Sequence, residues 1–133
     1  MARATVIDGD SALLIERGRG LDIGEWFLAG GYLEYDESPR EGAARELGEE
    51  TGLSVSPTDL TLIGDGFLDA GNGLTMVSFN YAASKVAAEG TLQADDDAAA
   101  ARFWSRDELK TNAPALRASG LQQLLTAIDE LGR

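Results

Sequence analysis

The chain has 133 residues, of which 44% are hydrophobic, and this is enough for one domain, residues 1–133, with a buried core. Its formal net charge of −12 argues against nucleic acid as a partner, because nucleic-acid binding needs a basic patch. The sequence has no cysteine and no histidine, so thiolate nucleophiles, imidazole bases and zinc sites of the usual kind are excluded.

The charge balance has two interpretations. The chain has 23 acidic residues against 11 basic ones, and only Lys85 and Lys110 are lysines. Such a surface suits a halophilic protein in a high-salt cytoplasm, where screening makes it tolerable, and an ordinary acidic protein is the alternative.

Every apolar run is shorter than the ~18 residues needed to span a bilayer, and no signal peptide is visible. We therefore expect a cytoplasmic protein without a membrane partner.

The N-terminal part of the chain predicts a hairpin followed by a loop. Residues 3–8 and 11–16 are apolar enough to form two strands, and the dipeptide Gly9–Asp10 between them is typical of a tight turn. Residues 17–24 are rich in glycine and charge, which indicates a loop. The short apolar run 26–28 then leads into a glycine pair.

After the glycine pair, the sequence marks both ends of a helix. Ser38 is a good N-cap, Pro39 suits the first helical position, and Glu41 completes a capping box. Gly52 follows the last turn, where a left-handed residue is favoured. The sequence therefore predicts a helix over Pro39–Thr51.

Three glutamates share one face of this helix. Glu46, Glu49 and Glu50 stand at positions i, i+3 and i+4 and lie within reach of one another. Carboxylates at this spacing repel each other, so either solvent and salt dilute the repulsion or a cation lies among them. The preceding pair Gly30–Gly31 favours the cation, because glycines let the backbone approach a ligand closely. An all-oxygen site favours Mg²⁺ or Mn²⁺.

The middle of the chain predicts a second hairpin. Residues 60–68 and 74–83 read as strands joined near Gly71–Gly73. Residues 91–101 are rich in alanine and aspartate without periodicity, which indicates a loop. Residues 102–104 then form a short strand.

The C-terminal part predicts two helices. Ser105 and Glu108 form a second capping box for a short helix that reaches Lys110. Pro114 breaks the chain, and the amphipathic stretch 116–131 makes a closing helix. Strands and helices alternate loosely, so we expect an α/β fold with a mixed sheet.

The stretch from Gly31 to Leu53 resembles the Nudix box, G-x5-E-x7-R-E-U-x-E-E-x-G-U, in which U is aliphatic. Every specified position is filled, by Gly31, Glu37, Arg45, Glu46, Leu47, Glu49, Glu50, Gly52 and Leu53. The chain is therefore similar to the Nudix hydrolases. This resemblance implies a Nudix-type α/β/α sandwich with a mixed β-sheet and a pyrophosphohydrolase that acts on a small-molecule nucleotide.

The resemblance also implies the metal site. Glu46, Glu49 and Glu50 would hold Mg²⁺, with Mn²⁺ as the alternative, and the backbone carbonyl of Gly30 would supply another oxygen. Bound divalent ions can neutralise a pyrophosphate and make water nucleophilic near neutral pH. Glu46, Glu49 or a loop carboxylate could accept the proton of that water, and the general base stays open among them. Without metal, the three glutamates should have raised, coupled pKa values.

The other residues of the box would support this site. Arg45 and Glu37 are expected to form an ion pair that orients the metal-binding glutamates, as groups behind a metal ligand do. Gly31 is expected to contact substrate through the turn. The sequence departs from the family pattern at Ala29, where a proline is common, and at Asp36, where a glycine is common.

Charged residues outside the box are further candidates. Arg17 and Arg19 are the nearest upstream cations, which either reach a substrate phosphate or are solvated in the loop, and Arg17 is the better candidate. The family frequently places an acidic residue just before the strand at 102–104. Asp95–Asp97 occupy that place, so Asp97 is a candidate metal ligand, and a solvated acidic loop is the alternative.

The substrate class is less sharply defined by the sequence. Family members that cleave ADP-ribose often have a proline where Asp69 stands. A nucleoside diphosphate linked to another moiety, such as an ADP-ribose-like compound or a nucleotide sugar, is the preferred substrate. The alternatives are a (d)NTP pyrophosphohydrolase of the housecleaning type, a non-catalytic Nudix-fold nucleotide-binding module and a purely structural acidic helix. Because many small members of the family are dimers, the chain could also form a homodimer.

Overall fold

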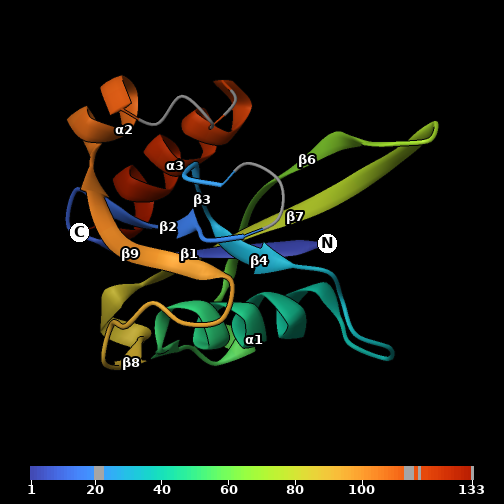
Figure 1. Ribbon diagram of the computed structural model, residues 1–133. Helices are drawn as coiled ribbons and strands as arrows, with labels where there is room; N and C mark the ends of the chain where they lie inside the picture. The colour runs from blue at the N-terminus through green and yellow to red at the C-terminus, as the bar shows by residue number, and fades with distance from the viewer. Residues whose placement is uncertain (20–22, 113–115, 117, 133) are drawn as a thin grey trace.

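A mixed β-sheet crosses the middle of the molecule in the computed structural model, with helices on both of its faces (Figure 1). The structure describes residues 1–19, 23–112, 116 and 118–132. Neighbouring strands follow the order β3-β2-β1-β7-β6, with β4 paired to β1 and β9 paired to β2. Strands β1 and β7 are parallel, and the other described pairs are antiparallel. The expected α/β/α sandwich with a mixed sheet is confirmed.

The strands of the large sheet are β1 (Ala2–Asp8), β2 (Ser11–Arg17), β3 (Trp26–Phe27), β4 (Ala29–Gly31), β6 (Thr61–Gly71), β7 (Leu74–Ser84) and β9 (Ala98–Ser105). A separate pair is formed by β5 (Leu53–Ser54) and β8 (Glu89–Gly90). The helices are α1 (Pro39–Thr51), α2 (Arg106–Asn112) and α3 (Ala118–Leu131), with short 3₁₀ turns η1 (Pro57–Asp59) and η2 (Lys85–Ala87). Among the described residues, no helix combines the length and the apolar character that a bilayer crossing requires.

Two hydrophobic clusters lie on opposite faces of the sheet, and the central strands contribute to both. In β2, Leu13 and Ile15 belong to the cluster under α1, while Ala12 and Leu14 belong to the cluster under α3. Successive side chains of a strand point to opposite faces, so a strand covered on both faces needs a continuous apolar run. This explains why the second strand is apolar throughout instead of alternating.

Helix α1 begins and ends where the sequence predicts. The Ser38 hydroxyl accepts a hydrogen bond from the Glu41 amide at 3.2 Å, and the Glu41 carboxylate accepts one from the Ser38 amide at 3.0 Å. Gly52 follows with φ of 77°, in the left-handed region. Ala43 and Leu47 are fully buried against the sheet. Because one side of α1 is packed in this way, its glutamates are directed toward β4 and the surface.

The predicted loop over residues 91–101 is wrong in its last four residues. Ala98–Ala101 form the first half of β9, in register with β2 through pairs such as Ile15 with Ala101 and Arg17 with Ala98. Alanine has a low intrinsic preference for strands, so local sequence gives little sign of this one. The strand exists because the edge of β2, distant in sequence, supplies its hydrogen-bond partners.

Other differences concern where elements begin and end. Arg17 is the last residue of β2 and not the first of a loop, and the closing helix begins at Ala118. Strand β6 continues to Gly71, and strand β7 begins at Leu74. Together they form a two-stranded ribbon that projects from the body of the protein (Figure 1). The expected chain break at Pro114 lies outside the described residues.

Candidate active site

The glycine pair of β4 brings the backbone against both β1 and the acidic face of α1. A Cβ atom on Gly31 would lie 2.7 Å from Oε1 of Glu46, and one on Gly30 would collide with the backbone of Ala2 and Arg3. Distances of this kind are essentially never seen for real Cβ atoms, so neither position has room for a side chain without movement. The glycines therefore let the strand lie directly beside the glutamates.

Arg45 binds three of the carboxylates at once. Its Nε and Nη2 donate to the two oxygens of Glu37 at 2.7 and 2.9 Å, in the two-pronged geometry that suits a guanidinium. Its Nη1 donates to Glu46 at 3.1 Å and to both oxygens of Glu49 at 3.3 Å. Nη2 also donates to the backbone carbonyl of Tyr32 at 3.2 Å. One cation thus fixes the loop after β4 to the acidic face of α1.

The expected ion pair between Arg45 and Glu37 is therefore present. Hydrogen bonds from Arg45, and one from the Glu34 backbone amide at 2.9 Å, lower the pKa of Glu37 from 4.5 to about 2. The Glu37 side chain is only 12% exposed. Glu37 is thus ionised throughout the physiological range and serves as a fixed anion that positions Arg45.

Glu50 has the opposite environment. Its residue is only 2% exposed, and its Oε2 accepts a hydrogen bond from the amide of Gly30 at 3.2 Å. Burial, followed by the charge of Glu46, raises the pKa of Glu50 from 4.5 to about 8. Burial also raises the pKa of Glu46. The raised, coupled pKa values expected without metal are confirmed for these two residues, and near neutral pH the pair retains a proton.

The donor chemistry of this face fits a hard divalent cation, since it consists of carboxylate oxygens, part of them shielded from water. Among the residues that the structure describes, no three acidic side chains already form a metal-binding group. Arg45 draws Glu46 and Glu49 toward itself, whereas Glu50 is turned to the Gly30 amide. A cation would let Glu50 ionise, so a buried neutral carboxyl beside a second carboxyl fits such an ion.

Gly30 meets the acidic face through its N–H group, which donates to Glu50. The sequence had singled out its carbonyl as a metal ligand, and that role stays a prediction. Arg17, at the end of β2, lies near enough to Glu50 for its charge to lower the pKa of that carboxyl. The structure thus brings the preferred upstream cation to the acidic site.

The acidic loop before β9 also reaches the site, although Asp97 is directed elsewhere. The amide of Asp95 donates to the backbone carbonyl of Glu50 at 3.1 Å, which attaches the loop to the end of α1. The Asp97 carboxylate forms an ion pair with Arg19, which also lies 3.6 Å from Asp96. Arg19 therefore pairs with an aspartate of this loop, and its side chain is still 71% exposed, which fits the solvated-loop interpretation. A metal-binding role for Asp97 stays a prediction.

Two residues of the site were missed at the sequence level. The Glu34 amide binds Glu37, and the Tyr32 carbonyl binds Arg45, both through backbone atoms. Backbone contacts leave little trace in residue type, so only their position between the glycine pair and the helix could have indicated them. Tyr32 is 69% exposed, although it carries a large aromatic side chain.

The mixed sheet, the glycine pair and the glutamate-bearing helix together define a Nudix-type fold. Comparison with known proteins agrees, because the NUDIX domain family matches residues 2–124. The chain belongs to this family, the family of the Nudix hydrolases.

The chain is 29% identical over 120 residues to the 8-oxo-dGDP phosphatase NUDT18 of Danio rerio, covering 89% of this chain and 34% of that protein. The chain spans about a third of the length of the curated relatives it matches.

Among solved structures, a MutT NUDIX hydrolase from Burkholderia pseudomallei superposes with a TM-score of 0.76 at 26% identity, covering 92% of each chain. A bifunctional NMN adenylyltransferase/ADP ribose pyrophosphatase from Francisella tularensis, complexed with AMP and a manganese ion, shares the fold. Its TM-score is 0.73 at 23% identity, covering 98% of this chain and 41% of that one.

Proposed function

We propose that the chain is a pyrophosphohydrolase, dependent on Mg²⁺ or Mn²⁺, that cleaves a nucleoside diphosphate linked to another moiety. The observation that carries the proposal is Glu50, which is 2% exposed and has a pKa raised to about 8 beside Glu46. Burying a carboxyl next to a second carboxyl lowers the stability of the fold, and a bound cation would compensate for this by pairing with both of them. Perturbed carboxyls of this kind are common at catalytic sites.

Glu46, Glu49 and Glu50 would hold the ion, with the Gly30 carbonyl as a further donor. A bound divalent ion supplies charge neutralisation for the diphosphate and a water that ionises near neutral pH. Glu46, Glu49 or a carboxylate of the loop at Asp95–Asp97 would accept the proton of the attacking water.

The remaining residues of the site would act by position. Arg45, fixed by Glu37, holds Glu46 and Glu49 at 3.1 and 3.3 Å and keeps them oriented. Gly31 lets the backbone lie directly against Glu46, and that backbone would contact the substrate. Arg17, whose charge acts on Glu50, would bind a phosphate oxygen.

A second candidate is the housecleaning of damaged or non-canonical nucleotides. The observation that favours it is the 29% identity over 89% of this chain with an 8-oxo-dGDP phosphatase. The two candidates differ in the group attached to the phosphate and not in the metal chemistry. A non-catalytic nucleotide-binding module is less favoured, because every glutamate of the box is retained.

The test is a product assay with Mg²⁺ or Mn²⁺ on ADP-ribose, nucleotide sugars, dinucleotides, 8-oxo-dGDP and (d)NTPs. We expect turnover that requires the metal and falls by roughly 10²–10⁴-fold in Glu50→Gln, which keeps the size of the side chain. Turnover in the presence of a chelator would contradict the proposal. Binding of nucleotides without turnover of any of them would favour the non-catalytic module.

The acidic surface adds a proposal about the host. A protein adapted to a high-salt cytoplasm should lose activity at low KCl, because screening then no longer relieves its net charge of −12. The measurement is turnover and oligomeric state between low and molar KCl, and an unchanged rate would identify an ordinary acidic protein. The same measurement tests for a homodimer.

A further inference from the structure

Tyr32 is an exposed aromatic residue that is fixed at two points. Its backbone carbonyl accepts a hydrogen bond from Arg45 at 3.2 Å, and its hydroxyl donates to the sulfur of Met76 at 3.8 Å. The residue is nevertheless 69% exposed, so the ring presents much of its surface to solvent. The loop after β4 and strand β7 thus hold an open aromatic ring in place.

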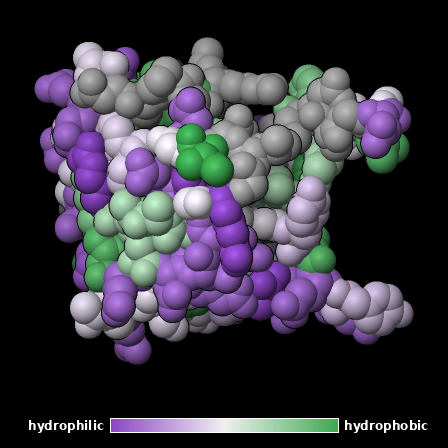
Figure 2. Space-filling model, in the orientation of Figure 1, coloured by the Kyte–Doolittle hydropathy of each residue, from purple (hydrophilic) through white to green (hydrophobic). Residues whose placement is uncertain are grey.

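The ring lies next to the acidic site but on the other side of the chain. The Cα of Gly31 faces Glu46, and successive side chains of an extended chain alternate. Tyr32 accordingly points toward Met76 of β7. The surface is hollowed between the loop after β4 and the β6–β7 ribbon, the two projections at the right of Figure 2. The contact between Tyr32 and Met76 joins the loop after β4 to strand β7 of this ribbon.

We propose that Tyr32 and Met76 form the surface on which the base of a nucleotide substrate stacks. This inference rests on the proposed function, since it assigns the base of the same substrate whose phosphates lie at the glutamates. A flat ring and a polarisable thioether are both suited to the face of a base. Neither side chain is charged, which matches an uncharged, planar ligand group beside an otherwise ionic site.

The geometry also accounts for the position of the ring. A nucleoside diphosphate extends well beyond its phosphates, so phosphates near Glu46 place the base some distance away. Gly31 separates the two sites with no side chain between them. Arg45 binds both Glu46 and the backbone of Tyr32, so the same residue sets the positions of the catalytic face and of the ring.

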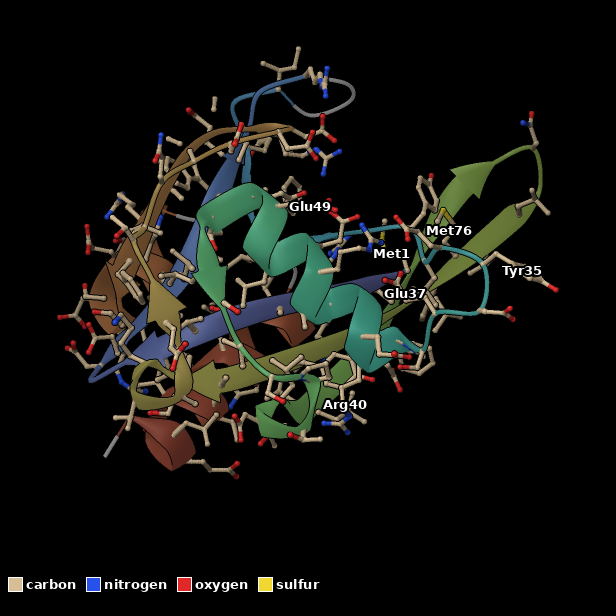
Figure 3. All side chains as sticks on the ribbon, turned by 90° about the horizontal axis from the view of Figure 1, so that it is seen from below. Met1, Tyr35, Glu37, Arg40, Glu49 and Met76 are labelled. Atoms are coloured by element: carbon tan, nitrogen blue, oxygen red, sulfur yellow. The ribbon has the colours of Figure 1, made fainter. Side chains whose placement is uncertain are left out.

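The chain offers a matched control. Tyr35 lies in the same loop and is 95% exposed, and it points away from the rest of the protein in Figure 3. Tyr32→Ala and Tyr35→Ala remove the same side chain from the same loop. Of these two variants, Tyr32→Ala removes the contact with Met76 and Tyr35→Ala does not. Tyr32→Phe removes the hydroxyl that makes this contact but retains the ring.

The experiment measures binding of AMP, GMP and inorganic pyrophosphate by calorimetry in Mg²⁺, without need of turnover. Base stacking on an aromatic residue is worth about 1–3 kcal/mol, or roughly 5- to 150-fold in affinity. We expect Tyr32→Ala to weaken both nucleotides within this range and to leave pyrophosphate unchanged. Tyr32→Phe should bind within about threefold of wild type, Met76→Ala should lose roughly two- to fivefold, and Tyr35→Ala should lose nothing.

Equal nucleotide affinity in Tyr32→Ala and Tyr35→Ala would overturn the inference, and so would loss of pyrophosphate binding in Tyr32→Ala. Wild-type protein that binds pyrophosphate but neither nucleotide would also overturn it. Nucleotide binding that depends on Tyr32, without hydrolysis of any substrate, would support the inference and contradict the proposed hydrolase.

Discussion

Glu37 and Glu50 belong to the same site, and their pKa values are shifted in opposite directions. Glu37 receives two hydrogen bonds from Arg45, and its pKa falls to about 2. Glu50 accepts one hydrogen bond, from the backbone amide of Gly30, and is almost fully buried, and its pKa rises to about 8. Both residues are glutamates, so the difference in pKa comes from the groups that surround each carboxylate.

The comparison shows how one cation is shared. Arg45 gives its strongest contacts to Glu37 and its longer ones to Glu46 and Glu49. Glu50 instead accepts a hydrogen bond from a backbone amide, and such a dipole stabilises an ionised carboxylate less well than a full charge does. A carboxyl group that the internal cation does not neutralise is the one that an external cation can bind.

The largest effect that we expect is in the pH dependence set by Glu50 without metal. Between pH 4.5 and about 8, the folded protein holds a proton that the unfolded chain has released. The free energy of unfolding therefore falls as the pH rises through this window, by up to about 1.4 kcal/mol per pH unit. Glu50→Gln should lack this fall, so its stability relative to wild type should increase from pH 5 to pH 8.

Urea denaturation in a chelating buffer at several pH values measures this difference. Glu89→Gln makes the same charge change at an exposed position and should not reproduce it. Addition of Mg²⁺ should restore wild-type stability near pH 8 but have little effect on Glu50→Gln, because only the wild type has an ionisable carboxyl there. Parallel pH profiles for wild type and Glu50→Gln would contradict our account of this carboxyl.

Removal of the shared cation should have the next largest effect. Arg45→Met leaves Glu37 and Glu46, with side chains only 12% and 13% exposed, without their partner. We expect a loss of about 2–3 kcal/mol in the free energy of unfolding, since an unpaired charge in such a place is costly. The affinity for Mg²⁺ should change as well, because Glu46 and Glu49 lose their orientation.

Arg106→Met is the control for Arg45→Met. Arg106 forms an ion pair with Asp129 at the surface, where such pairs contribute less than about 1 kcal/mol. Thermal and urea unfolding of both variants would show whether the arginine that binds several carboxylates differs from one that pairs with a single exposed aspartate. Equal losses would mean that Arg45 acts as an ordinary surface residue.

Glu37→Gln should give a smaller loss with the opposite pH dependence. The pKa of Glu37 is lowered in the folded state, so its stabilising effect is present above pH 4.5 and disappears as the pH falls toward 2. The variant should be less stable than wild type at pH 7, and the difference should shrink in acid. Unfolding measured from pH 7 to pH 2 tests this, and a difference that grows in acid would contradict it.

The smallest effect should come from Asp36, the residue before Glu37. Its φ is +63°, a left-handed conformation that glycine adopts freely and that aspartate tolerates. Asp36→Gly should therefore raise the free energy of unfolding slightly, by about 0.5 kcal/mol, and Asp36→Ala should lower it. Thermal unfolding of the two variants side by side measures the difference. A more stable Asp36→Ala would show that backbone strain is not the reason.

Sequence alone determined the framework of the site. Ser38, Glu41 and Gly52 set both ends of α1, because capping depends on atoms a few residues apart. The spacing of Glu46, Glu49 and Glu50 on one face follows from helical periodicity. These features are local, and the structure reproduces them.

Tertiary structure decided what the sequence left open. The strand at Ala98–Ala101 depends on β2, and the pairing of Asp97 with Arg19 joins two loops that are distant in the chain. Burial distinguishes Glu50 from the other glutamates of the helix. Helical spacing predicts the direction in which each glutamate points, but it does not predict which distant residues pack against it. A residue's own type fixes its charge, whereas its pKa and its partners depend on which distant segments pack around it.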